Sequence, residues 1–187
     1  MITGTYHRYH RPVDYAVVDD TPEKVRTLWP LPGGSGSYLA AVSTMLDIVR
    51  STTDTDEVVD RLMAHFQGVR SRKAARSYLH VLGHLGLVEL DGPVVRLSRS
   101  GATFLQSRDP AIVRDALLAR IAGVDDLVFI LWRHPARIGL LLPQLQARGY
   151  RWTTLSQVRY RLRWLEELGV VTRHGRGRPE YRVTNHP

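Results

Sequence analysis

One stretch near the C-terminus, residues 153–184, constrains the fold most, because its hydrophobic period changes along its length. From Leu155 to Leu168 the apolar residues recur every three or four positions, which indicates one buried face of a helix. Thr153 or Thr154 can cap the start of this helix, and a glycine directly after it suits its end. Two β-prone runs follow, separated by the turn-forming letters HGRGRPE. The stretch therefore predicts a helix followed by a two-stranded hairpin.

The same order of elements occurs once earlier in the chain, at an offset of 83 residues. At this offset Leu79, Leu82 and Leu85 align with Leu162, Leu165 and Leu168. The alignment extends upstream, where Val58, Val59 and Leu62 align with Leu141, Leu142 and Leu145, and Leu46 and Val49 align with Phe129 and Trp132. We interpret this as an internal duplication of one supersecondary unit. The alternative is that two unrelated amphipathic helices both end in Leu-Gly.

These patterns predict a mainly α chain with small β-hairpins, in the α+β class. The expected helices cover residues 38–50, 55–66, 71–86, 102–107, 110–121 and 125–134, with a first hairpin over 87–98. A further helix is expected to begin near Pro143, since proline breaks or kinks a helix interior; a kinked helix from Ile138 is the alternative. The expected division of the chain is an N-terminal arm (1–37), a first unit (38–108), a linker helix (109–122) and a second unit (123–187).

The arm carries the letters TYHRYHRP, whose His7 and His10 lack the further ligands of a metal site, so a basic and aromatic arm is the favoured interpretation. Thr21-Pro22-Glu23 favours a helix start, with Pro22 at the first helical position. The loop at 30–37 lacks the Gly-Lys-Ser/Thr ending of a phosphate-binding loop.

Several classes of protein are disfavoured by what the 187 residues lack. There is no cysteine, which excludes disulfides, thiolate metal sites and a cysteine nucleophile. No apolar run approaches the roughly 20 residues that cross a bilayer, so we expect a soluble, cytoplasmic protein. No nucleophile motif or carboxylate pair indicates catalysis, and we expect neither an enzyme nor a cofactor.

The formal net charge of +8 is concentrated in the second unit. Residues 1–122 contain 15 Lys and Arg against 13 Asp and Glu, whereas residues 123–187 contain 11 against 5. A localised basic region is typical of nucleic-acid binding, in which cationic side chains neutralise phosphates and release counterions.

Candidate DNA-binding residues follow from a helical wheel and from the basic hairpin tip. In the second unit they are Thr154, Ser156, Gln157, Arg159, Tyr160, Arg161, Arg163, Arg173, His174, Arg176 and Arg178. In the first unit they are Arg70, Arg72, Lys73, Arg76 and Ser77. Gln and Arg suit base edges and phosphates, although each helical residue is as compatible with a solvated surface. Glu89 and Asp91 make the first hairpin a poor DNA partner, so the second unit is expected to dominate affinity.

The motifs SRKAARSYLHVLGHLGLVEL, VVRLSRSGATFL, TTLSQVRYRLRWLEELGVVTR and PEYRVT resemble winged helix-turn-helix units of prokaryotic DNA-binding proteins. The resemblance implies two winged-helix units in tandem, whose third helices and wings contact double-stranded DNA. It implies such contacts for Lys73, Arg76, Gln157, Tyr160, Arg161, Arg176 and Arg178. Transcriptional regulators and recognition modules of restriction or phage-defence systems share this pattern, so we expect a non-enzymatic protein that acts on the nucleoid.

Two alternatives remain open at this stage. Tandem winged helices also serve as protein-assembly modules, and Trp164, which projects away from the centre of the apolar stripe, can pack against the wing, another domain or a second protomer. A homodimer or a larger complex fits that interpretation. The other alternative is an accessory domain for a separate enzyme chain.

Overall fold

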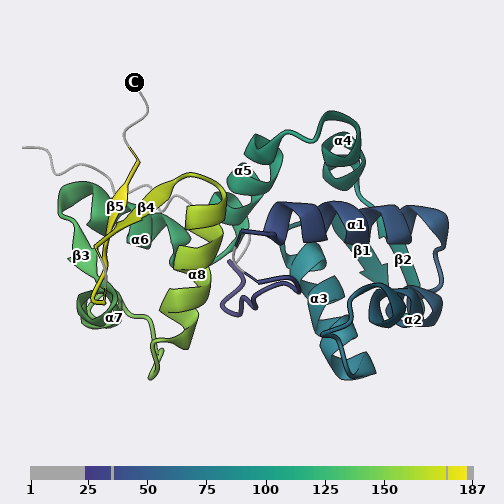
Figure 1. Cartoon of the computed structure of the whole chain (residues 1–187), viewed down its shortest axis with the longest axis horizontal. Coiled ribbons are helices and arrows are strands. Elements are labelled where there is room, and N and C mark those ends of the chain that lie inside the picture. The colour runs from purple at the N-terminus through teal and green to yellow at the C-terminus, as the bar shows by residue number, and fades with distance from the viewer. Residues whose placement is uncertain (1–23, 35, 176, 185–187) are drawn as a thin grey trace, which may run out of the picture.

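The described residues of the computed structural model, 24–34, 36–175 and 177–184, form eight helices and two small antiparallel sheets (Figure 1). The N-terminal half contains α1 (Tyr38–Ser51), α2 (Thr55–His65), α3 (Arg72–His84), β1 (Val88–Asp91), β2 (Val94–Leu97) and α4 (Arg99–Ser107). Next comes α5 (Pro110–Arg120). The C-terminal half contains α6 (Val124–Arg133), β3 (Ala136–Arg137), α7 (Ile138–Gln146), α8 (Ser156–Glu167), β4 (Val171–His174) and β5 (Glu180–Val183).

Local capping explains where the N-terminal helices begin. The side chain of Asp54 accepts a hydrogen bond from the Glu57 amide at 2.8 Å, and Ser71 accepts one from Ala74 at 3.2 Å, as expected of N-cap residues. Gly92 turns the β1–β2 hairpin with a positive φ of 54°, which a side chain would oppose. The helices and the hairpin expected between residues 38 and 121 are confirmed.

The C-terminal half adds a third strand to its hairpin, in the order β3-β5-β4. The helix expected near Pro143 instead begins at Ile138, so that expectation was wrong. Proline removes the hydrogen bond to the carbonyl of Gly139, but both residues are exposed and water can satisfy that carbonyl. The expected threonine cap of α8 was also wrong, because Leu155 occupies the N-cap without a side-chain bond. Gly169 ends α8 with a φ of 68°, as expected.

The two halves bury equivalent positions over most of their length. Val58 and Leu141, and likewise Leu79 and Leu162, are fully buried, and each pair is 83 residues apart. The first helices depart from this offset, since Phe129 and Trp132 are 43% and 69% exposed. The buried equivalents there lie 85 residues apart: Val42 and Leu127, Met45 and Ile130, Leu46 and Leu131. Two fewer residues separate the first two helices' buried positions in the C-terminal half, which moved the aligned pair onto the surface.

Residues 24–34 are packed between the two halves, contrary to the expected arm (Figure 1). Val25 forms a parallel bridge with Ile121, and Leu28 and Leu31 are buried in a core cluster that includes residues from both halves. No helix begins here: the described residues from Lys24 to Leu31 are extended, while Thr21-Pro22-Glu23 and the two N-terminal histidines lie outside the described residues. Two apolar side chains with spacing typical of an extended chain account for this packing.

Gly101 provides a test of the packing of α4 against the hairpin. A Cβ atom at this position would overlap the backbone carbonyl oxygen of Leu87. Because backbone cannot move as a side chain does, Gly101→Ala is expected to lower the free energy of unfolding by about 1–3 kcal/mol in urea titrations. Gly139→Ala, in α7 with nothing within 4 Å of the added atom, is the control and is expected to be neutral or stabilising by up to about 1 kcal/mol. Equal effects of the two substitutions would contradict this packing.

Candidate nucleic-acid interface

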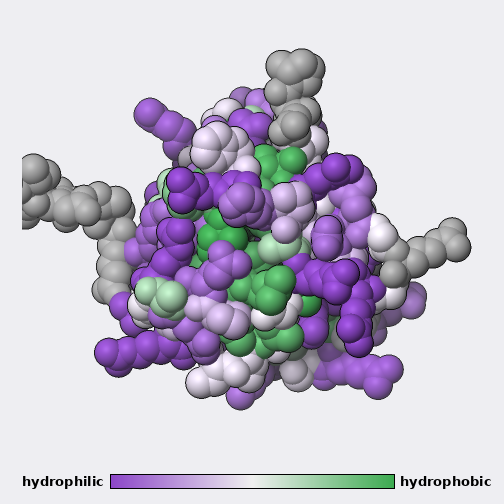
Figure 2. Space-filling model, turned by 90° about the vertical axis from the view of Figure 1, so that its left-hand side faces the viewer, coloured by the Kyte–Doolittle hydropathy of each residue, from purple (hydrophilic) through white to green (hydrophobic). Residues whose placement is uncertain are grey.

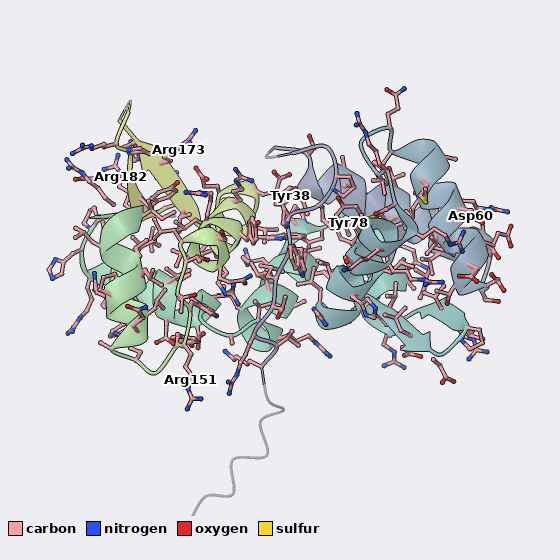
Figure 3. The ribbon with its side chains drawn as sticks, turned by 90° about the horizontal axis from the view of Figure 1, so that it is seen from below. Tyr38, Asp60, Tyr78, Arg151, Arg173 and Arg182 are labelled. Atoms are coloured by element: carbon pink, nitrogen blue, oxygen red, sulfur yellow. The ribbon has the colours of Figure 1, made fainter. Side chains whose placement is uncertain are left out.

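The hairpin of β4 and β5 carries exposed arginines on both strands and at its tip. Arg173 and Arg182 lie on the outer side of the hairpin at the end of the molecule remote from Asp60 (Figure 3), and Arg178 is exposed in the tip. His174 is hydrogen bonded to Arg182 at 3.0 Å. The candidate Arg176 lies outside the described residues. The hairpin is therefore an accessible cationic surface.

Arg182 was missed by the sequence reasoning, although its strand carried a signal for it. In the run Tyr181-Arg182-Val183, Tyr181 is buried, and alternation along a strand turns the next side chain to the opposite face. Arg137 was missed in the same way, because the short strand β3 was not expected. Both residues add to the basic surface of the sheet.

Few carboxylates oppose these charges. Residues 156–183 contain seven arginines and three glutamates. Glu166 lies 3.6 Å from Arg173, and Glu180 lies 3.6 Å from Arg137. Arg173, Arg137 and Glu180 are more than half exposed in these pairs, so the pairs are weak and phosphate can compete for the arginines.

The outer face of α8 is not available as expected, and Arg161 shows this most clearly. This candidate DNA contact is fully buried, which corrects the sequence-based expectation. Its guanidinium donates to the carbonyl oxygens of Ala122 at 2.7 Å, Arg26 at 2.8 Å and Gln157 at 3.0 Å. Burial lowers the pKa of Arg161 to about 10, so the group remains charged at neutral pH. Arg161 joins three segments of the chain and cannot reach DNA in this conformation.

Gln157 is also engaged within the protein. Its side-chain oxygen accepts hydrogen bonds from the Leu28 amide at 3.4 Å and from Arg161 at 2.8 Å. Bidentate recognition of adenine needs that oxygen as an acceptor. The expected base contact by Gln157 is therefore incompatible with these bonds.

Aromatic packing completes the cover over α8. Trp164 is fully buried, with its ring centroid 4.9 Å from that of Tyr38 in α1, and its Nε1 donates to the Trp29 carbonyl at 3.3 Å. Of the alternatives for Trp164, packing against another part of the chain is the one observed. Tyr160 lies beside the Trp29 ring, at a centroid distance of 6.2 Å. The remaining α8 candidates, with the residue before the helix, are exposed at Thr154 and Arg159 and half-buried at Ser156, Tyr160 and Arg163.

The start of α3 is more accessible than α8. Arg70 and Lys73 are exposed, while Arg72 forms ion pairs with Asp56 and Asp60, and Arg76 pairs with Asp56 at 2.7 Å. The bonds from Arg76 and Arg72 lower the pKa of Asp56. The candidate Ser77 donates its hydroxyl to the Lys73 carbonyl at 3.0 Å. Two of the four cations expected to bind phosphate are thus held by α2, in exposed pairs that phosphate can exchange.

An open cavity of about 340 Å³ lies beside the start of α3, and it includes Trp29, Lys73 and Tyr78. Trp29 is 47% exposed there. Since Trp29 also lies beside Tyr160 of α8, residues 28–31 separate the outer faces of the two helices that the sequence nominated for DNA contact. The segment covers α8 and leaves the start of α3 accessible.

Comparison of the chain with protein-family models, with curated proteins and with solved structures gives no match. Within the described ranges, none of the helices combines the length and the apolar character needed to span a bilayer. Function is therefore argued from the geometry of the described residues.

Proposed function

We propose that the chain is a non-enzymatic protein that binds duplex DNA through two winged-helix units, residues 38–108 and 123–187, joined by the linker helix 109–122. The order helix, strand, helix, helix, hairpin in the C-terminal half supports this proposal. The N-terminal half has the same order, with the isolated bridge between Asp54 and Val94 in place of the first strand. A role as a cytoplasmic transcriptional regulator or as part of a restriction or phage-defence system fits such a protein.

The observation that carries the proposal is the exposed arginine hairpin of β4 and β5. Arginines on the two strands and at the tip present guanidinium groups to solvent, and Gly175 and Gly177 hold the tip in turns with φ of 91° and 79°. Such a narrow cationic hairpin fits along a phosphate backbone or in a minor groove. Lys73 and Arg70 at the start of α3 supply a second cationic contact.

The cover over α8 changes the kind of recognition that we propose. With Arg161 and Gln157 engaged internally, the hairpin and the start of α3 provide most of the contacts, and these side chains reach phosphates. Phosphate contacts position a protein on DNA but carry no direct sequence information. We therefore expect strong dependence on salt and weak discrimination between duplex sequences.

The test compares two triple variants that remove equal charge. Arg173, Arg178 and Arg182 are replaced by glutamine in one variant, and Arg50, Arg61 and Arg114 in the control, where each arginine pairs with a carboxylate of its own helix. Fluorescence anisotropy with a labelled random duplex gives affinity over a series of salt concentrations. The hairpin variant is expected to reduce the slope of log affinity against log salt by about 2–3, while the control changes it by less than about 1.

Two results would contradict the proposal. One is the absence of binding by the unmodified protein at low salt. The other is an equal loss in the hairpin and control variants, because that would mean that only the net charge matters.

A specific surface favours protein assembly as the second candidate function. Phe129, Trp132 and Leu140, on α6 and α7, are 43%, 69% and 60% exposed. Figure 2 shows apolar side chains gathered at the centre of this end of the molecule, within a hydrophilic surround. Exposed apolar patches of this kind are typical of binding surfaces. Light scattering after size exclusion, run beside the DNA titration, distinguishes the two functions: a concentration-dependent mass that falls on Trp132→Ser, without DNA binding, favours assembly.

A further inference from the structure

A cavity of about 520 Å³ lies between residues 24–27, the loop from α7 to α8, and the start of α8. Its volume falls within the range of small-molecule pockets. The cavity is lined by four cationic side chains, Lys24, Arg26, Arg148 and Arg151, and by no carboxylate. This site is separate from the arginine hairpin, and its chemistry has to be explained independently of DNA.

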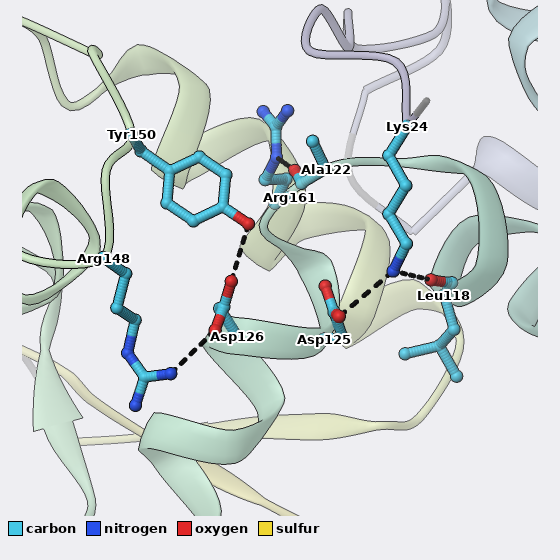
Figure 4. Close-up of polar contacts among 8 residues, drawn as sticks. All are labelled: Lys24, Leu118, Ala122, Asp125, Asp126, Arg148, Tyr150 and Arg161. Carbon is cyan, nitrogen blue, oxygen red and sulfur yellow. Dashed lines mark hydrogen bonds and ion pairs between the residues drawn. The ribbon is translucent and has the colours of Figure 1, made fainter. Parts of the chain in front are cut away.

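Two carboxylates at the start of α6 partly balance these charges (Figure 4). Lys24 Nζ lies 3.0 Å from Asp125 Oδ2 and donates to the Leu118 carbonyl at 3.1 Å. Arg148 Nη1 lies 2.7 Å from Asp126 Oδ1. The four cations therefore exceed the two neighbouring carboxylates by two positive charges. Arg151 is exposed, and its guanidinium reaches the edge of the molecule in Figure 3. An occupant with two negative charges would balance the cavity.

The aromatic wall of the cavity is already ordered by internal contacts. The rings of Tyr150 and Trp152 are stacked at a centroid distance of 4.7 Å. The Arg161 guanidinium lies 4.1 Å from the Trp152 ring centroid, and the Tyr150 hydroxyl donates to Asp126 at 2.6 Å. Burial and the bond to Asp126 raise the pKa of Tyr150, so its hydroxyl keeps its proton. A wall fixed before binding costs little conformational entropy when a ligand enters.

We propose that this cavity binds a small organic phosphate. Guanidinium and ammonium groups bind phosphate oxygens through charge-assisted hydrogen bonds, and the two unbalanced charges match a phosphate dianion. The aromatic side chains of the wall provide contact area for the organic part of the ligand. Because Lys24 and Arg26 belong to the segment that covers α8, a bound phosphate would also connect that segment to the α7–α8 loop. The proposal does not depend on DNA binding.

Calorimetry and thermal unfolding with adenosine monophosphate and with pyrophosphate test the site, and adenosine is the uncharged control. Both phosphates are expected to bind and to raise the melting temperature, because they bind only the folded state. The double variant Arg26→Gln with Arg151→Gln is expected to weaken their binding about tenfold or more. Arg96→Gln with Arg99→Gln, exposed on β2 and α4, removes the same charge and is expected to leave binding within about twofold.

The same variants distinguish a free phosphate ligand from the phosphates of DNA. A free small molecule requires that the Arg26 and Arg151 double variant lose phosphate binding while its duplex affinity stays equal to that of the Arg96 and Arg99 control. The proposal is overturned if millimolar phosphates neither release heat nor raise the melting temperature of the unmodified protein. It is equally overturned if both double variants bind the phosphates alike, or if adenosine binds as well as its phosphate.

Discussion

Replacing Arg161 with alanine is expected to lower the free energy of unfolding by about 2–5 kcal/mol. Arg161 is fully buried and donates to the backbone carbonyls of Arg26 and Ala122, which lie in two different segments. Its removal would leave these two carbonyls without that donor, at a cost of about 1–3 kcal/mol each. The change would also leave a void beneath the Trp152 ring, which the guanidinium now covers. Urea unfolding followed by circular dichroism measures this difference.

Arg159 provides the matched control, because it lies on the same helix and is exposed. Arg159→Ala is expected to change stability by less than about 0.5 kcal/mol. Arg161→Met keeps much of the volume but none of the donors, so a similar loss in this variant would assign the cost to the carbonyls. If Arg161→Ala were no more destabilising than Arg159→Ala, the described environment of Arg161 would be wrong.

Trp164→Ala is expected to destabilise the protein by about 3–5 kcal/mol, the usual cost of removing a large buried aromatic side chain. Trp164 is fully buried, packs on Tyr38 of the N-terminal half, and donates to the Trp29 carbonyl. The substitution opens a void where α8, α1 and residues 28–31 meet. Thermal unfolding measures the loss, and Trp132→Ala, at a residue that is 69% exposed, serves as the control with little expected change.

The outcome also tests whether the two halves depend on each other. Since Trp164 lies between them, Trp164→Ala should lower the midpoint of the whole unfolding transition or split it into two. A stability within about 0.5 kcal/mol of the unmodified protein would mean that the outer face of α8 is solvated. That result would restore α8 as a candidate for reading DNA bases.

These two residues explain why the proposed DNA surface differs from the one that the sequence suggested. Arg161 and Trp164 lie on the side of α8 that turns away from its own half, which is where a helical wheel places contacts with a groove. In the structure that side is occupied by residues 26–31 and by the start of α1. Arginine and tryptophan suit nucleic-acid contacts and interior packing equally, so residue type could not separate the two roles.

The order of elements was the most predictable feature, because it depends on local signals. The stripe of Val158, Leu162 and Leu165 predicted α8, and the left-handed glycine Gly169 predicted its end. Local signals failed where solvent compensated for a poor residue, as at Pro143, and where an alignment offset changed within a loop, as at Phe129 and Trp132. The exposed arginines of the hairpin were foreseen at Arg173 and Arg178 because turn and strand chemistry are also local.

By itself the sequence determined the helices, the two hairpins, the repeated apolar positions and the basic character of the C-terminal half. Only the tertiary structure decided that residues 24–31 lie across α8, that Arg161 is a buried donor, and that four cationic side chains line one cavity. The physical reason is the range of the interactions involved. Periodicity and capping act over a few residues, whereas the burial of a polar side chain depends on partners such as Arg26 and Ala122, far away in the chain.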